Sequence, residues 1–154
     1  MPVQSNIFGI IFGLTAVAFN LFIAAILIAQ KLGRDKLVRT LGLLWLSLLF
    51  PLTLAFVSFR QAEQDARILL YFGLVFLYML VELLLDYIFK VDFRRKAITH
   101  VPYILLEYLA LFSLIAIAFE IDPRWGWAVS ICFWILMGSL VFSYWGKIFG
   151  RKKA

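Results

Sequence analysis

The sequence predicts an all-α integral membrane protein, built as a bundle of five transmembrane helices. Apolar residues make up 64% of its 154 residues, against about 45–50% in soluble globular proteins. A small soluble domain leaves much of its surface in water, so burial in lipid explains this composition better. One domain covering residues 1–154 is expected at this length.

Five apolar runs are long enough to cross a bilayer, which takes about 20 residues for about 30 Å of hydrocarbon. The runs are continuous and do not alternate, which favours helices over the strands of a membrane barrel. Pro51 lies inside the second run and predicts a kink, because proline leaves a helical carbonyl without its donor. The expected helices cover residues 7–29, 40–59, 68–89, 101–119 and 126–146.

The cations fall on one side of this topology. The 30–39 loop, the 90–100 loop and the 147–153 tail together hold twelve of the fifteen Lys and Arg residues. Short loops rich in these residues stay in the cytoplasm. We therefore expect the N-terminus outside, the C-terminus in the cytoplasm, and insertion in the cell membrane, either plasma or inner. Cations at the ends of apolar runs also argue against a nucleic-acid partner for the net charge of +6.

Aromatic residues near the ends of the runs agree with this orientation, because Tyr and Trp favour the depth of the membrane interface. The outer interface is expected at Tyr71, Trp125 and Trp127, and the inner one at Trp45, Tyr87, Tyr103, Tyr144 and Trp145. Gly9 and Gly13 form a G-x-x-x-G step, which fits close packing of helices or a dimer face.

Two carboxylates are placed where a bilayer makes charge costly. Glu82 lies seven residues before the end of the third predicted helix, and Glu107 lies six residues after the start of the fourth. At 1.5 Å per residue, both are about 10 Å inside the cytoplasmic boundary. An ionised carboxylate at that depth costs on the order of 2.5 kcal/mol or more. A short loop joins the two helices, so we expect antiparallel neighbours with the two glutamates level and facing.

Helical spacing extends this pair into a predicted pocket. Residues four apart share a helix face, and this spacing groups Tyr78, Glu82 and Asp86 on one helix and Tyr103 with Glu107 on the next. His100 lies about one turn closer to the cytoplasm. The predicted ligand-binding residues are therefore Tyr78, Glu82, Asp86, His100, Tyr103 and Glu107, with Arg94 and Arg95 at the mouth of the pocket.

Each of these residues also has a structural interpretation. An ion pair with Lys90, four residues further on, explains Asp86. His100 and Tyr103 fit interfacial positions. Glu82 and Glu107 would then form a neutral hydrogen bond, to each other or to a tyrosine, that holds two helices together without any ligand.

Three classes of function follow. Facing carboxylates repel when both are ionised, so the first hypothesis is a pocket that binds or translocates a proton, a metal ion or a cationic small molecule. Transport by a five-helix chain would imply a homo-oligomer. The alternative is a non-catalytic accessory or structural subunit of a larger membrane complex, in which a partner's Arg or Lys pairs with the carboxylates.

The second alternative is a membrane enzyme that modifies lipid or isoprenoid substrates, with arginines holding a phosphate and a glutamate acting as acid or base. The chain has no H-E-x-x-H, no C-x-x-C and no glycine-rich phosphate loop. An enzyme is therefore the least favoured of the three, and the identity of any metal or cofactor is left unassigned.

Overall fold

The computed structural model describes residues 7–61, 65–89 and 97–149, without the side chains of residues 97–100 and 145–149. Its elements are all helical: α1 (Ile7–Lys31), α2 (Asp35–Ser47), α3 (Leu49–Gln61), α4 (Ala66–Glu82), η1 (Leu83–Ile88), α5 (Ala97–Ile121) and α6 (Pro123–Phe149). Within these ranges, five segments are long and apolar enough to cross a membrane. They match the five predicted runs, because α2 with α3 and α4 with η1 each form one segment.

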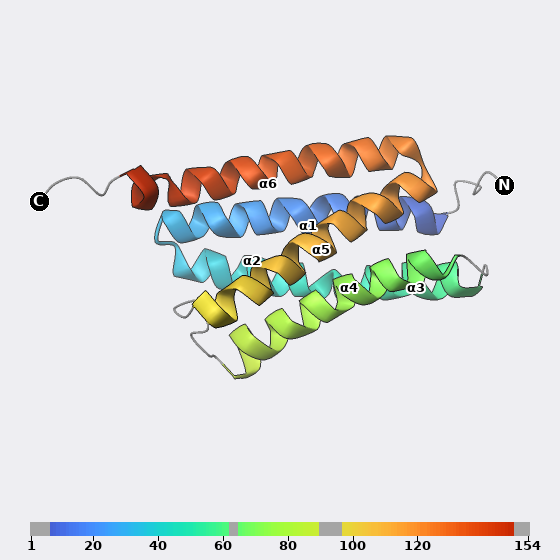
Figure 1. Cartoon of the computed structure of the whole chain (residues 1–154), viewed down its shortest axis with the longest axis horizontal. Coiled ribbons are helices and arrows are strands. Elements are labelled where there is room, and N and C mark those ends of the chain that lie inside the picture. Colours follow the sequence, from blue (N-terminus) through green and yellow to red (C-terminus); the bar gives the residue numbers. More distant parts are fainter. Residues whose placement is uncertain (1–6, 62–64, 90–96, 150–154) are drawn as a thin grey trace, which may run out of the picture.

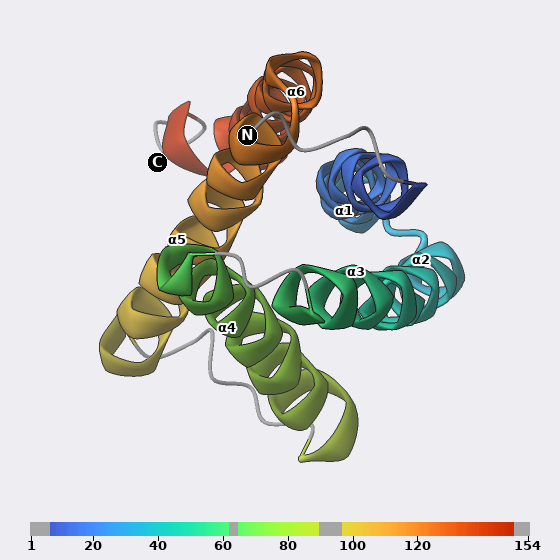
Figure 2. The same cartoon turned by 90° about the vertical axis from the view of Figure 1, so that its right-hand side faces the viewer.

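The central element is α1, which packs against α2, α3, α5 and α6 (Figure 1). The α4 helix packs against α3 and α5, and α5 in turn packs against α6. The predicted antiparallel neighbours, α4 and α5, are therefore in contact. Seen end on, α4 and α5 lean away from the other helices (Figure 2). At the end of the bundle where α1 finishes, η1 thus diverges from α2 (Figure 1).

Capping residues explain where several helices begin and end. The last turn of α1 closes at Gly33, whose φ of 66° suits glycine. The Gly33 N–H donates to the Gln30 carbonyl at 3.1 Å, as in a Schellman motif. At the start of α6, the Asp122 side chain accepts from the Arg124 N–H at 2.8 Å. Pro123 then occupies the first helical position, where its missing N–H costs nothing.

The predicted helix boundaries differ from the observed ones because apolar runs do not include the capping turns. The helix predicted to start at residue 101 begins at Ala97, and the one predicted to start at residue 126 begins at Pro123. The predicted 7–29 helix continues to Lys31, and the predicted 68–89 helix begins at Ala66. Polar residues at helix ends satisfy free backbone groups, so helices extend beyond their apolar stretches.

The kink predicted at Pro51 is confirmed as a break within the second segment. The predicted 40–59 helix begins at Asp35 and divides at Leu48 into α2 and α3. Pro51 has no N–H to offer the Ser47 carbonyl four residues before it, and α2 ends at Ser47. At the break the Leu48 N–H donates to the Trp45 carbonyl at 3.1 Å.

A second irregularity closes the third segment. After Glu82 the helix widens into a π-helical turn, η1, and the Phe89 N–H donates to the Leu84 carbonyl five residues earlier at 2.8 Å. A π turn holds one more residue than an α turn, so it changes the direction of the side chains that follow. Asp86 and Tyr87 both lie in this turn.

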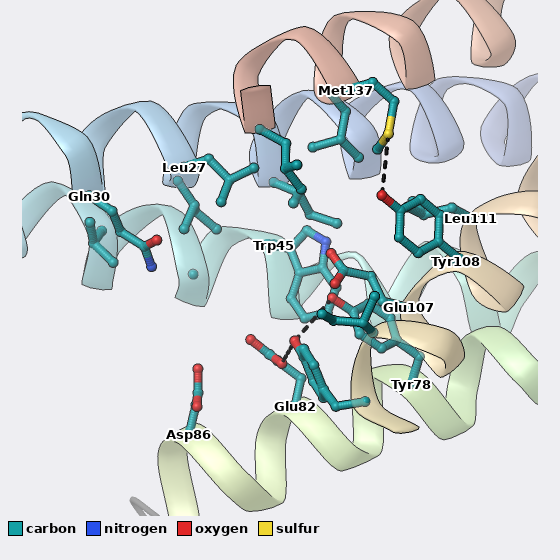
Figure 3. Close-up of a pocket in the computed structure, with 18 of the residues that line it drawn as sticks. Leu27, Gln30, Trp45, Tyr78, Glu82, Asp86, Glu107, Tyr108, Leu111 and Met137 are labelled. Carbon is teal, nitrogen blue, oxygen red and sulfur yellow. Dashed lines mark hydrogen bonds between the residues drawn. The ribbon is translucent and has the colours of Figure 1, made fainter. Parts of the chain in front are cut away.

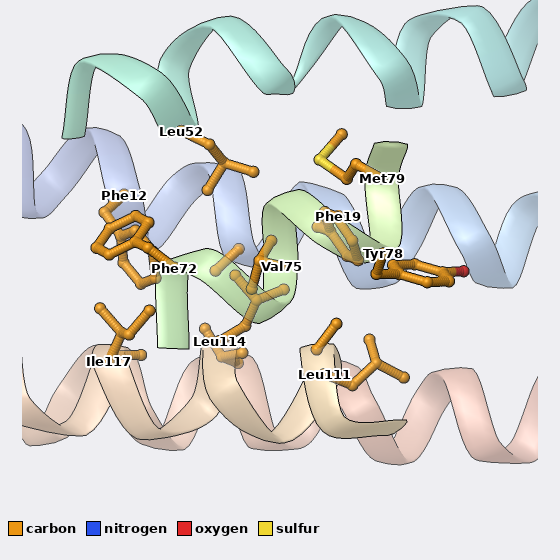
Figure 4. Packing of buried hydrophobic residues seen from close by; sticks show 14 of the residues in the cluster. Phe12, Phe19, Leu52, Phe72, Val75, Tyr78, Met79, Leu111, Leu114 and Ile117 are labelled. Atoms are coloured by element: carbon orange, nitrogen blue, oxygen red, sulfur yellow. The ribbon is translucent and has the colours of Figure 1, made fainter. Parts of the chain in front are cut away.

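Large apolar side chains fill the core of the bundle (Figure 4). Phe12 of α1 and Phe72 of α4 are fully buried, with ring centroids 5.5 Å apart in an edge-on arrangement. Leu52, Leu114 and Ile117 are fully buried beside them. Tight aromatic and aliphatic packing of this kind supplies the dispersion contacts that hold helices together when lipid is the solvent.

The helix pair α1 and α6 is joined at both ends. A Cβ atom on Gly13 would overlap three atoms of the Trp125 indole of α6, the farthest of them at 2.6 Å. A Cβ atom on Gly9 would lie 2.9 Å from Ile121, the last residue of α5. At the other end the Ser143 hydroxyl donates to the Leu27 carbonyl at 3.0 Å. The two glycines thus serve close packing within the chain, and their surface is covered by Trp125 and Ile121.

Candidate functional site

A cavity of about 380 Å³ lies between α1, α2, α4, η1, α5 and α6, towards the end of the bundle where α1 finishes (Figure 3). Its volume falls within the range of about 300–1,000 Å³ that is usual for small-molecule sites. Most of the wall is apolar or aromatic. The lining residues are Ile23, Ile26, Leu27, Gln30, Val38, Gly42, Trp45, Tyr78, Glu82, Asp86, Tyr87, Tyr103, Ile104, Glu107, Tyr108, Leu111, Leu136, Met137, Leu140 and Tyr144.

Five of the six residues predicted to bind a ligand line this single cavity: Tyr78, Glu82, Asp86, Tyr103 and Glu107. The sixth, His100, belongs to the first turn of α5, and its side chain is outside the part of the chain that the structure describes. Arg94 and Arg95, predicted at the mouth, are also outside the described residues.

Glu82 and Tyr103 join α4 to α5 inside the cavity. The Tyr103 hydroxyl donates a hydrogen bond to Glu82 Oε2, and the Tyr78 and Tyr103 hydroxyl oxygens are 3.4 Å apart. Tyr78 and Tyr103 are buried, whereas Glu82 is half-buried. This hydrogen bond is of the kind expected if the glutamates only hold two helices together. It lies in the wall of the cavity.

Glu107 completes the acidic pair from α5. Its carboxylate is half-buried and lines the cavity together with Tyr78 and Tyr103. Glu82 and Glu107 thus line the same cavity as these two tyrosines, from two helices that are in contact. Both carboxylates are drawn beside Tyr78 in Figure 3.

The third carboxylate, Asp86, reaches the cavity from η1. In Figure 3 it lies towards Gln30, away from Tyr108 and Met137. Its predicted ion-pair partner, Lys90, is outside the described residues. Three acidic side chains from α4, η1 and α5 therefore share one small volume, a placement that attracts positive charge.

The burial of Trp45 contradicts its predicted position in an inner aromatic belt. A belt residue faces the lipid interface, but the Trp45 side chain is only 3% exposed and forms part of the cavity wall. Its ring packs against Phe19 at 5.0 Å and against Tyr78 at 5.7 Å between centroids. Among the described residues its indole Nε1 has no hydrogen-bond partner, although that atom is buried.

Tyr87 and Tyr144, also assigned to that belt, line the cavity as well. Tyr87 reaches from η1 to α2, where a Cβ atom on Gly42 would overlap its hydroxyl oxygen. The absence of a side chain at Gly42 therefore allows the two elements to meet across the diverging end of the bundle.

Sequence reasoning did not find the wall supplied by α1 and α6. Gln30 is the polar residue that α1 contributes to the lining. On the opposite side the Tyr108 hydroxyl donates to Met137 Sδ at 3.5 Å and links α5 to α6. Tyr108 directly follows Glu107, so the prediction of Glu107 came within one residue of it. Among the residues that the structure describes, the lining from α1 and α6 contains no charged side chain that would have marked it.

The lining combines three carboxylates with one tryptophan and five tyrosines. Carboxylates attract cations, and the faces of aromatic rings bind them through the ring quadrupole. Across the described residues, no group of three His, Cys, Asp or Glu side chains is arranged to hold a metal ion. The chemistry suits an organic cation whose apolar part contacts the aromatic wall. Comparison with known proteins finds no matching family model, curated protein or solved structure.

Proposed function

We propose that this chain is an integral protein of the cell membrane that binds a cationic small molecule in the cavity between its helices. Five apolar helical segments support the membrane location. So do large apolar side chains on the outside of the bundle, such as Phe50 and Trp134, which are 73% and 71% exposed. Exposing such side chains to lipid costs little free energy, whereas exposing them to water is unfavourable. The cation bias of the loops favours an outer N-terminus and a cytoplasmic C-terminus.

The observation that carries the proposal is the presence of Glu82, Asp86 and Glu107 in the wall of one mostly apolar cavity. An ionised carboxylate is costly inside a membrane, and a bound cation offsets that cost. The volume of about 380 Å³ exceeds the needs of a bare ion and suits a molecule with an apolar body. Tyr78, Tyr103 and other rings supply the cation–π surface.

Proton exchange accompanies binding in this proposal. Two carboxylates that share an apolar cavity repel each other when both are ionised, so the empty cavity retains a proton that the incoming cation replaces. Such an exchange couples binding to the proton concentration on the side from which the ligand enters. A complete transport cycle with five helices per chain would use a homo-oligomer.

The test is a binding measurement on the purified protein in lipid nanodiscs, with pentyltrimethylammonium as the probe. Glu82→Gln and Glu107→Gln should each weaken binding about 10-fold or more, because a charge-assisted contact is worth about 1.5–3 kcal/mol. Calorimetry in buffers of different ionisation enthalpy should show proton release on binding to the wild type.

The matched control is Glu120→Gln, which neutralises an exposed glutamate of α5 far along the helix from the cavity. Equal affinity in all three variants would refute the proposal. Native mass spectrometry of the gently extracted protein separates the accessory-subunit alternative. A stoichiometric second polypeptide that dissociates from Glu82→Gln would support that alternative instead.

A further inference from the structure

We infer that the ligand carries a hydrogen-bond acceptor close to its cationic centre, and that Trp45 is the residue that selects for it. This inference rests on the proposed function and narrows its ligand class. The ligand would be an ammonium compound that also contains an ether, carbonyl, hydroxyl or heteroaromatic nitrogen. A proton, a metal ion and a simple tetraalkylammonium ion all lack the acceptor.

The unpartnered donor of Trp45 is the starting observation. An indole nitrogen can only donate, and Trp45 has a single such N–H. The side chain is 3% exposed, it lines the cavity, and among the described residues Nε1 finds no acceptor. Leaving a buried donor without an acceptor costs free energy. A ligand that supplies the acceptor recovers that free energy, and a ligand without one does not.

The packing of Trp45 holds this donor in place. Its ring meets Phe19 at 5.0 Å and 58° and Tyr78 at 5.7 Å and 74°, measured between centroids and ring planes. The indole cannot rotate to another partner without leaving both rings. The donor is therefore preorganised, which is how a site gains selectivity without losing affinity to reordering.

Tyr78 places the donor close to the acidic pair. The Trp45 ring packs against the Tyr78 ring, and the Tyr78 hydroxyl oxygen lies 3.4 Å from the Tyr103 hydroxyl oxygen. The Tyr103 hydroxyl already donates to Glu82, so it is not free to serve a ligand acceptor without breaking that bond. When the cation of a ligand lies near Glu82 and Glu107, only the Tyr78 ring therefore separates it from the Trp45 side chain.

The burial of Nε1 strengthens the selection. The atom is closed off from water in the unliganded cavity, so the donor stays unsatisfied there. Ligands with an acceptor at the right position are therefore favoured over apolar ligands of the same shape.

The experiment compares three isosteric probes in nanodiscs: pentyltrimethylammonium, (2-ethoxyethyl)trimethylammonium and (3-methoxypropyl)trimethylammonium. The two ethers replace one methylene with oxygen at successive positions. We expect one ether to bind the wild type about three- to tenfold more tightly than the all-carbon probe, as one net hydrogen bond allows. Trp45→Phe should abolish this preference, so that the two ethers and the all-carbon probe bind the variant about equally tightly.

A second variant guards against a folding defect in Trp45→Phe. Replacement of Trp45 alone with 3-benzothienylalanine keeps the bicyclic shape and removes only the N–H. Trp134→Phe is the matched control, because its ring is 71% exposed on the outside of the bundle. It should retain the full ether preference.

The outcomes separate this inference from the proposed function. If wild type binds the all-carbon probe through Glu82 but prefers neither ether, the inference is wrong and the cation site stands. If both Trp45 variants keep the preference, or lower the affinity of all probes equally, Trp45 only packs the wall. If the wild type binds none of the probes, the proposed function fails and the inference fails with it.

Discussion

A single methyl group added at Gly13 should loosen the contact between α1 and α6. The Cβ atom of Gly13→Ala would overlap Cδ2, Cε3 and Cε2 of Trp125, and the farthest of these is 2.6 Å away. Carbon atoms in contact ordinarily stay about 3.5–4.0 Å apart. These three atoms belong to the middle of the indole, so the whole ring has to move by about 1 Å or more to restore ordinary contact.

The magnitude follows from two opposing terms. Overpacking of this kind typically costs about 1–3 kcal/mol, whereas replacing glycine with alanine inside a helix gains about 1 kcal/mol. Gly73→Ala isolates the second term, because nothing lies within 4 Å of its added Cβ. The free energy of unfolding of Gly13→Ala should therefore be lower than that of Gly73→Ala by about 1–3 kcal/mol.

Reversible unfolding in mixed micelles, followed by circular dichroism during a titration with denaturing detergent, measures this difference. Trp125→Leu in the Gly13→Ala background should recover stability, and the double-mutant cycle should give a coupling energy of about 1 kcal/mol or more. Equal stabilities of Gly13→Ala and Gly73→Ala would refute the assignment of Trp125 to the glycine surface. A changed oligomeric state at unchanged stability would instead place the G-x-x-x-G step in an interface between chains.

Three further predictions use the same unfolding measurement. Gly42→Ala should destabilise the protein by about 1 kcal/mol, because the added Cβ overlaps the Tyr87 hydroxyl. Tyr87→Phe should restore the stability of this variant, because the nearest ring atom, Cζ, lies 3.4 Å from the added Cβ. If stability is not restored, the two residues do not meet. Tyr103→Phe should cost about 1–3 kcal/mol by removing the hydroxyl that bridges α5 to α4, and a neutral effect would contradict that bridge. Ser143→Ala should cost about 0.6 kcal/mol by removing a bond to an α1 carbonyl, while Ser139→Ala, whose hydroxyl bonds only within α6, should cost less.

Much of the fold could be predicted because long apolar segments leave the backbone few choices. A helix satisfies its own backbone polar groups within one segment, which suits runs as apolar as these. Pro51 located the break at Leu48 for a similarly local reason, since a missing N–H acts on the carbonyl four residues before it. The helix ends were less predictable, because Asp122 and Pro123 act through capping rather than through hydropathy.

The π turn had no local signal. The sequence of η1, LLLDYI, is as compatible with an α-helix as with a wider turn. The turn lies where α4 packs on α5 and where Tyr87 meets Gly42 across the diverging end of the bundle. These are contacts between distant segments, and no window along the chain contains both partners.

Five of the twenty residues that line the cavity could be predicted, and the reason is chemical. Glu82, Asp86 and Glu107 stand out in an apolar helix, and the spacing of four places Tyr78 beside them. Trp45 does not stand out, because Trp is common near membrane interfaces and its burial depends on which face α2 turns inward. Only Gly42 and Trp45 of α2 are buried, and apolar residues such as Leu43 and Leu44 are exposed beside them, so hydropathy does not separate the inward face from the outward one.

The positions of the irregularities connect the fold to the cavity. The break at Leu48 follows Trp45 by three residues, η1 contains Asp86 and Tyr87, and Pro102 precedes Tyr103 inside α5. Each of these three segments contributes to the wall close to its own irregularity. Prolines and π turns are the usual causes of bends in helices, so α2, α4 and α5 can diverge there while α1 and α6 remain packed together along their length.

Packing in the core offsets the contacts that are lost where the helices diverge. Phe12 and Phe72 meet edge to face, and Leu114 and Ile117 are fully buried beside them, so the bundle gains dispersion contacts in that region (Figure 4). The diverging end gives up such contacts around the cavity and gains polar ones, of which the Tyr103–Glu82 hydrogen bond joins α5 to α4. Low-stability regions are where proteins bind ligands and change shape. Under the proposed function, a ligand that bridges the carboxylates and Trp45 would add contacts between α2, α4 and α5 at this end of the bundle.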